Sequence, residues 1–189
     1  VRRGTGRRAH TAGQKIWEWL PTTPICPGDS PYQSVSAFAG SPLMVALEPL
    51  VVAGWLDPPA PPSGGFDPLR VDFGHVVPWR LAQLRQAYQG FTVKNALPEQ
   101  QAFADWRSQE ASWLDDYSLF MALETENQGK AWWHWPDAEC RREAQALAGA
   151  RLRLADEIGF WAFVQWCFDT QLALLKNYEY RQAGTDTAK

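Results

Sequence analysis

Residues 28–38, with the sequence GDSPYQSVSAF, are the most informative stretch of this chain, and AGSP at residues 39–42 continues them. Because glycine, proline and serine favour turns, the stretch predicts a surface loop. Short apolar segments flank it, with IWEWL at residues 16–20 before it and LMVAL at residues 43–47 after it. We interpret this order as a buried strand that ends in a binding loop, as at the carboxyl end of a barrel strand.

The loop also supplies the candidate ligand-binding side chains, which follow one another closely: Asp29, Ser30, Tyr32 and Gln33. Aspartate and serine often bond to their own backbone in turns, so a purely structural role for Asp29 and Ser30 is an alternative. We expect residues 34–38 to hold a helical turn that Ser34 or Ser36 caps.

The composition is that of a globular chain, since 46% of its 189 residues are hydrophobic, enough for one domain with a sizeable core. No apolar run approaches the length of a membrane helix. The basic start, at residues 1–8, lacks the apolar stretch that follows in a secretory signal. A net charge of −3, without a basic face, argues against a nucleic-acid partner. Three widely separated cysteines, Cys26, Cys140 and Cys167, indicate a reducing, cytoplasmic compartment.

Tryptophan is unusually frequent, with eleven residues. Indole faces stack on the apolar faces of sugar rings, so this richness favours a carbohydrate ligand, whereas the alternative is large side chains in a helical core. The run WWHWP at residues 132–136 allows the same two interpretations, and we favour packing. Cys167 follows apolar neighbours and is expected to be a buried thiol.

Two pairs of adjacent acidic residues, at 115–116 and 156–157, resemble catalytic acid pairs. Neighbouring residues on a helix do not face one another, so we expect each pair to lie on a solvated face.

Hydrophobic spacing and turn residues predict mainly helices. The expected segments are a short helix within 48–54 ended by Gly54, a helix over 78–88 with Pro78 in its first turn, two helices within 97–127, a turn at 132–136, a helix over 137–148, and a long buried helix over 152–178. Residues 57–65, rich in proline and glycine, are expected to be a surface connection.

Several further stretches match segments of one known family in amino-acid sequence and in order. They are AGQKIW at 12–17, RVDFGHVVPWR at 70–80, WLDDYSLFMAL at 113–123, Trp132 with the WP at 135–136, ADEI at 155–158 and FVQW at 163–166. Together with the loop at 28–38, they resemble the 4-α-glucanotransferases, also called amylomaltases or disproportionating enzymes, which are family 77 of the glycoside hydrolases. The resemblance covers roughly residues 12–178.

This resemblance implies an α/β fold, in which residues 1–95 form an early part of a (β/α)₈ barrel with its loop. Residues 96–189 would form a mainly helical subdomain. The implied reaction transfers a segment of an α-1,4-glucan to a new 4-position by a retaining mechanism. That chemistry uses a nucleophilic Asp and an acid/base Glu, without a metal or an organic cofactor. The implied partners are maltooligosaccharides, and neither a membrane nor a nucleic acid.

The resemblance assigns Tyr32 to the donor side of the glucan groove and gives Ser30 a hydrogen bond to a sugar hydroxyl. Asp29 and Gln33 belong to the same loop. In the family both catalytic carboxylates lie on later barrel strands, so no catalytic residue is expected within these 189 residues. Residues 1–11 and 181–189 depart from the family pattern. We therefore expect an inactive fragment; the alternatives are a non-catalytic α-glucan-binding remnant and a pseudogene product without a stable fold.

Overall fold

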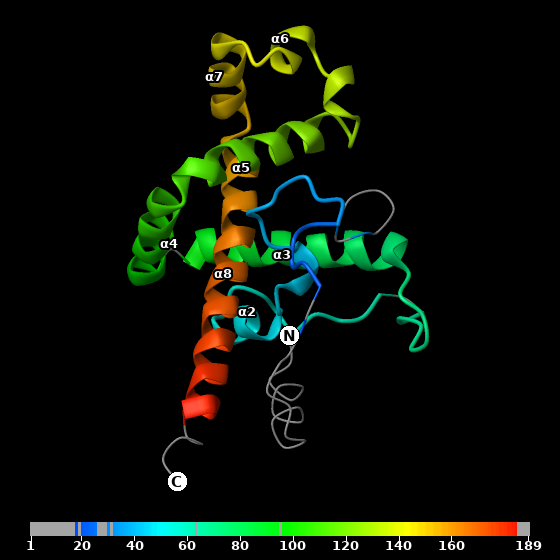
Figure 1. Cartoon of the computed structure of the whole chain (residues 1–189), viewed down its shortest axis with the longest axis vertical. Helices are drawn as coiled ribbons and strands as arrows, with labels where there is room; N and C mark the ends of the chain where they lie inside the picture. Colours follow the sequence, from blue (N-terminus) through cyan, green and yellow to red (C-terminus); the bar gives the residue numbers. More distant parts are fainter. Residues whose placement is uncertain are drawn as a thin grey trace. The chain divides into compact units, whose positions relative to one another are not determined.

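The computed structural model describes residues 18, 20–25, 30, 32–62, 64–94 and 96–184, with side chains as far as residue 177. Within these residues the regular structure is helical, and no strand occurs. The elements are η1 (Pro42–Met44), α2 (Glu48–Val52), α3 (Phe73–Lys94), α4 (Leu97–Gln109), α5 (Ala111–Glu126), η2 (Trp132–His134), α6 (Asp137–Cys140), α7 (Ala144–Arg153) and α8 (Ala155–Gly184) (Figure 1).

The expected barrel strands are therefore not seen in the part of the chain that the structure describes. The expected strand at residues 16–20 lies mostly outside that part. Residues 43–47 do not pair with another segment there: they continue from η1 into α2. The structure divides into two compact units, one of Val1–Gly90 with Cys167–Lys189 and one of Phe91–Trp166. The division into a barrel part and a helical subdomain at residue 95 remains a prediction.

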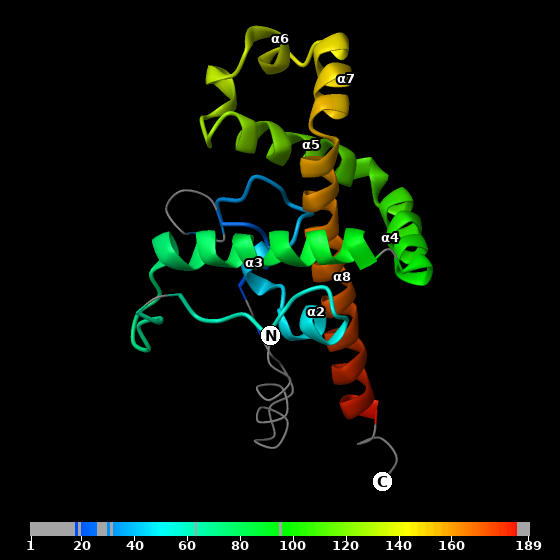
Figure 2. The same cartoon turned by 180° about the vertical axis from the view of Figure 1, so that it is seen from behind.

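In the first unit, the C-terminal half of α8 holds the segment that joins η1 to α2. The amide of Gln171 bonds twice to the backbone of Ala46, accepting from its N–H at 2.7 Å and donating to its C=O at 3.0 Å. Both views show α2 beside this part of α8 (Figures 1 and 2). The adjacent side chains of Val45, Leu47 and Leu50 are buried. A short helix with one apolar face is thus stabilised by packing rather than by its own length.

Helix α2 matches the short helix expected at 48–54, and Gly54 follows it with φ of 70°. A positive φ suits glycine, which has no Cβ to clash with the backbone. Helix α3 differs from the expectation, because it begins at Phe73 and carries Pro78 in its interior. The carbonyl of Asp72 accepts from the N–H of His75 at 3.1 Å and from that of Val76 at 2.9 Å, which starts the helix before the proline.

In the second unit, the two helices expected within 97–127 are confirmed as α4 and α5. Their apolar faces meet buried side chains of α7 and of the first turns of α8. One group of these comprises Leu119, Ala122, Leu123, Trp135, Leu147, Ala150 and Ile158. Aromatic rings form another, with Phe91 5.0 Å from Phe163 and 5.6 Å from Phe103. Burying each such side chain contributes roughly 1.5–3 kcal/mol.

The single helix expected over 137–148 is wrong, since α6 ends at Cys140 and α7 begins at Ala144. Arg142 lies between them with φ of 56°, a left-handed conformation that a helix does not contain. The long helix is confirmed as α8, but it starts at Ala155, because α7 extends to Arg153. Within the described residues, no helix is both long and apolar enough to span a bilayer.

Candidate functional site

The candidate loop begins with a tight turn that brings three of its four predicted site residues together. The N–H of Gln33 donates to the carbonyl of Ser30 at 3.3 Å, and the N–H of Tyr32 donates to the Ser30 hydroxyl, also at 3.3 Å. Ser30 is partly buried, whereas Tyr32 and Gln33 are exposed. Asp29 lies outside the described residues. The Ser30 side chain thus braces the turn that carries Tyr32.

The next residues continue as a chain of serine-braced turns. The Ser34 hydroxyl accepts from the N–H of Ser36 at 3.3 Å. The Ser36 hydroxyl accepts from the N–H groups of Phe38 and Ala39 at 3.2 and 3.1 Å. The helical turn expected at residues 34–38 is wrong, since the structure has bends there and no helix. The Ser36 hydroxyl nevertheless makes the kind of contact expected of a cap, with the N–H groups two and three residues on.

The base of the loop is fixed to the first unit, and its tip is not covered. Ala39 and Ser41 are buried, and the N–H of Ser41 donates to the carbonyl of Thr22 at 2.7 Å. Gly40 lies against the ring of Phe168 so closely that a Cβ would overlap it. By contrast, the Tyr32 side chain is 72% exposed. The loop therefore presents an aromatic ring and its hydroxyl from an anchored base, an arrangement suited to stacking on a ligand.

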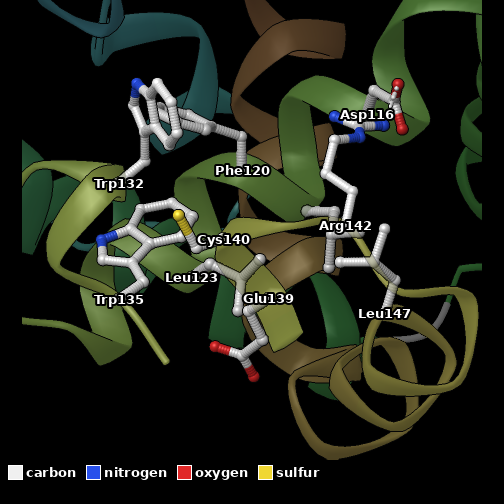
Figure 3. Close-up of a pocket in the computed structure, with 10 residues that line it drawn as sticks. Asp116, Phe120, Leu123, Trp132, Trp135, Glu139, Cys140, Arg142 and Leu147 are labelled. Carbon is white, nitrogen blue, oxygen red and sulfur yellow. Dashed lines mark hydrogen bonds and ion pairs between the residues drawn. The ribbon is translucent and has the colours of Figure 1, made fainter. Parts of the chain in front are cut away.

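A pocket in the second unit was not expected from the sequence. It has a volume of about 370 Å³ and is lined by residues of α5, η2, α6 and the start of α7. Figure 3 shows Trp132 and Trp135 on one side, Phe120 and Cys140 nearer the middle, and Arg142 with Asp116 on the other side. The signal in the sequence was the WWHWP run, but pattern alone did not show which of its rings face inward.

The tryptophans of the WWHWP run, at residues 132–136, differ in their exposure to solvent. Trp135 is only 8% exposed, its indole N–H donates to the carbonyl of Lys130 at 2.7 Å, and its ring lies 5.3 Å from that of Phe120. The favoured packing role is confirmed for this residue. Trp132 and Trp133 are instead 49% and 61% exposed. Packing does not account for these two rings.

Charged side chains connect the helices around the pocket. Arg142 donates to the carboxylate of Asp116 at 2.9 Å, which joins the α6–α7 turn to α5. Arg153 donates to both carboxylate oxygens of Glu126, at 2.7 and 2.8 Å, and to Glu139 at 2.8 Å. The Arg153 hydrogen bond holds the pKa of Glu126 below its ordinary value. The solvated faces expected for the acidic pairs fit the exposure of Asp115, Asp116 and Asp156.

Cys167 is buried as expected, and burial raises the pKa of its thiol. A buried neutral thiol is a poor nucleophile, so it behaves as a small apolar side chain in α8.

Comparisons with known proteins point to one family. A family model described as 4-alpha-glucanotransferase, of glycoside hydrolase family 77, matches residues 5–185. A 4-alpha-glucanotransferase of Thermus thermophilus is 44% identical over 167 residues, covering 87% of this chain and 32% of that protein. One of Clostridium butyricum is 34% identical over 169 residues, covering 88% of this chain and 34% of the relative.

A solved structure shares the arrangement as well. It is an amylomaltase from Streptococcus agalactiae in complex with acarbose, with a TM-score of 0.84 and 31% identity, over 94% of this chain and 36% of that one. The chain spans about a third of the length of the curated relatives it matches.

Proposed function

The chain belongs to the 4-alpha-glucanotransferase family, glycoside hydrolase family 77, and from this premise we propose that its loop at residues 28–41 forms one wall of a groove for α-1,4-glucan. The enzyme of which this wall is part would move a segment of one glucan to the 4-position of another. Residues 1–95 would then belong to a (β/α)₈ barrel and residues 96–189 to a helical subdomain. A cytoplasmic location accords with a cysteine that is kept as a buried thiol.

Tyr32 would stack its exposed ring on a glucose unit on the donor side of the groove. Ser30 would hydrogen-bond a sugar hydroxyl with the oxygen that also braces the turn, since a hydroxyl can accept and donate at once. Asp29 and Gln33 would contribute further polar contacts. A rigid loop base favours binding, because the ring need not be ordered at the moment of contact.

The reaction itself requires two carboxylates about 5–5.5 Å apart, one as nucleophile and one as acid/base. We infer from the family resemblance that both would lie on barrel strands other than the segments matched here. The residues of this chain would therefore bind and orient the glucan, and would take no part in bond cleavage. No metal or organic cofactor is needed for this chemistry.

The observation that carries the proposal is the exposed ring of Tyr32 on an anchored, serine-braced loop in a chain of this family. The test is calorimetric titration of the 189-residue chain with maltoheptaose. Replacing Tyr32 by alanine removes the stacking ring and should weaken binding about 2- to 10-fold. Tyr32→Phe keeps the ring and is the matched control. Equal affinity of the chain and Tyr32→Ala at this site would refute the role.

A second candidate is an α-glucan-binding polypeptide without catalysis. The observation that favours it is the half-exposed indole of Trp132, which needs no catalytic group in order to bind sugar. Formation of maltodextrins longer than maltotriose by the chain alone would rule out this candidate. Glucan binding without transfer fits both candidates, because the first also expects no bond cleavage by these 189 residues.

A further inference from the structure

The pocket of about 370 Å³ in the second unit lies apart in sequence from the loop that carries Tyr32. Its volume falls in the range of pockets that hold small ligands. The lining is mostly apolar, with charged groups at its margin, so it offers both stacking surfaces and hydrogen-bonding groups.

The aromatic surfaces differ in how firmly they are held. Trp135 and Phe120 form a fixed wall, since the Trp135 indole is tied to the carbonyl of Lys130 and both rings are in contact. Trp132 lines the same pocket with a half-exposed ring. Trp133 meets it edge-on, at 5.7 Å and 82°, and is not among the residues that line the pocket. Trp132 thus combines a place in the pocket lining with a face open to solvent.

The polar margin is supplied by Arg142 and Asp116, which bond to each other at 2.9 Å and keep 65% and 58% of their side chains exposed. Arg142 can donate to, and Asp116 can accept from, the vicinal hydroxyls of a sugar. In Figure 3 the Arg142 guanidinium lies beside the carboxylate of Asp116, and Trp132 lies on the opposite side of the pocket.

Glu139 is the second carboxylate at the pocket. One of its carboxylate oxygens accepts from Arg153 at 2.8 Å, while the other, Oε2, is buried and has no hydrogen-bond partner among the described residues. Its side chain is only 10% exposed and lines the pocket. The Oε2 oxygen has almost no accessible surface, and in Figure 3 the carboxylate points away from the aromatic rings, so Glu139 is not among the groups that would contact a ligand.

We propose that this pocket is a second α-glucan-binding site, in which a terminal glucose unit stacks on Trp132 and hydrogen-bonds to Asp116 and Arg142. The substrate class rests on the proposed function. A purely apolar ligand would contact the apolar lining but would make no hydrogen bond to Asp116 or Arg142. The amphipathic faces of glucose use the indole and the charged pair together.

The test uses the 189-residue chain carrying Tyr32→Ala, so that the loop site is weakened and the pocket is observed. Maltoheptaose should still bind this variant, and it should shift the indole N–H signal of Trp132 in a ¹⁵N spectrum, a signal identified by its loss in Trp132→Ala. Adding Trp132→Ala should weaken the remaining binding about 5- to 10-fold. Adding Trp133→Ala, which removes a more exposed indole outside the lining, should change it less than about twofold.

The outcomes separate this inference from the proposed function. If Tyr32→Ala alone abolishes binding, the pocket is not a glucan site, but the role of the loop stands. If binding persists and is unchanged by Trp132→Ala, the pocket proposal fails. If the apolar probe indole shifts the Trp132 signal and maltoheptaose does not, the pocket is apolar in specificity and the proposal is overturned. Because Trp132 is half-exposed, the far-UV circular dichroism of its alanine variant should match that of the parent.

Discussion

Two helical glycines provide a sharp test of the packing, because the same substitution should have opposite effects at each. Gly90 lies near the end of α3, and a Cβ there would overlap the backbone carbonyl oxygen of Trp55 and approach its carbonyl carbon at 2.8 Å. Gly149 lies within α7, and a Cβ there would meet no atom within 4 Å. We predict that Gly90→Ala destabilises the chain and that Gly149→Ala stabilises it.

The magnitudes follow from two opposing terms. Alanine is favoured over glycine inside a helix by roughly 0.5–1 kcal/mol, and this gain applies at both positions. At Gly90 it is opposed by overpacking, which costs up to about 3 kcal/mol here because a backbone carbonyl cannot rotate away as a side chain can. The net effect is about 2 kcal/mol of destabilisation for Gly90→Ala and about 0.5–1 kcal/mol of stabilisation for Gly149→Ala.

The assay is thermal unfolding of the 189-residue chain, followed by far-UV circular dichroism. With about 2–4 °C per kcal/mol for a chain of this size, Gly90→Ala should lower Tm by roughly 4–8 °C. Gly149→Ala should raise it by about 1–4 °C and is the matched control for helix propensity. A Gly90→Ala variant as stable as the parent would refute the close approach of α3 to Trp55.

Three further predictions concern the anchor of α2, pH and activity. Gln171→Ala removes both hydrogen bonds to Ala46 and should cost about 1–3 kcal/mol in urea unfolding. Gln171→Glu keeps the acceptor but sets a carboxylate oxygen against the Ala46 carbonyl, so it should destabilise as well. The hydrogen bond from Arg153 lowers the pKa of Glu126 in the folded chain. The stability that this carboxylate contributes is therefore present above its unfolded pKa and is lost as pH falls through its folded pKa. Glu126→Gln should destabilise the chain at pH 7 but not well below about pH 4. Burial raises the pKa of Glu124, so ionisation of this carboxyl opposes folding as pH rises. Glu124→Gln should therefore stabilise the chain at pH 7. If the stability of the Glu126→Gln and Glu124→Gln variants depended on pH in the same way, both assignments would be contradicted. Finally, after the 189-residue chain is incubated with maltotriose, chromatography should detect no maltodextrin longer than maltotriose. The appearance of longer products would place the catalytic carboxylates within these 189 residues.

The sequence pattern predicted correctly those helices and turns that depend on neighbouring residues. Helices α4 and α5 follow from hydrophobic spacing, and the end of α2 follows from Gly54, whose φ of 70° few other residues tolerate. The sequence and order of several motifs were sufficient to identify the family. The turn that groups Ser30, Tyr32 and Gln33 was also readable, because serine and proline direct nearby backbone groups.

Other features depended on contacts between residues far apart in sequence. The base of the candidate loop is fixed by a backbone hydrogen bond from Ser41 to Thr22 and by the ring of Phe168 against Gly40. The break between α6 and α7 places Arg142 in a left-handed conformation from which it reaches Asp116 on α5. No propensity of an arginine predicts that conformation.

The sequence alone therefore determined the family, most of the helices and the identity of the exposed loop, because motif wording, periodicity and turn chemistry act over a few neighbouring residues. Only the tertiary structure decided which tryptophans of the 132–136 run are buried and which line a pocket. It alone also showed why Gly40 and Gly90 cannot carry a side chain. The physical reason is that exposure and close approach depend on the surfaces of other helices, which adjacent residues do not encode.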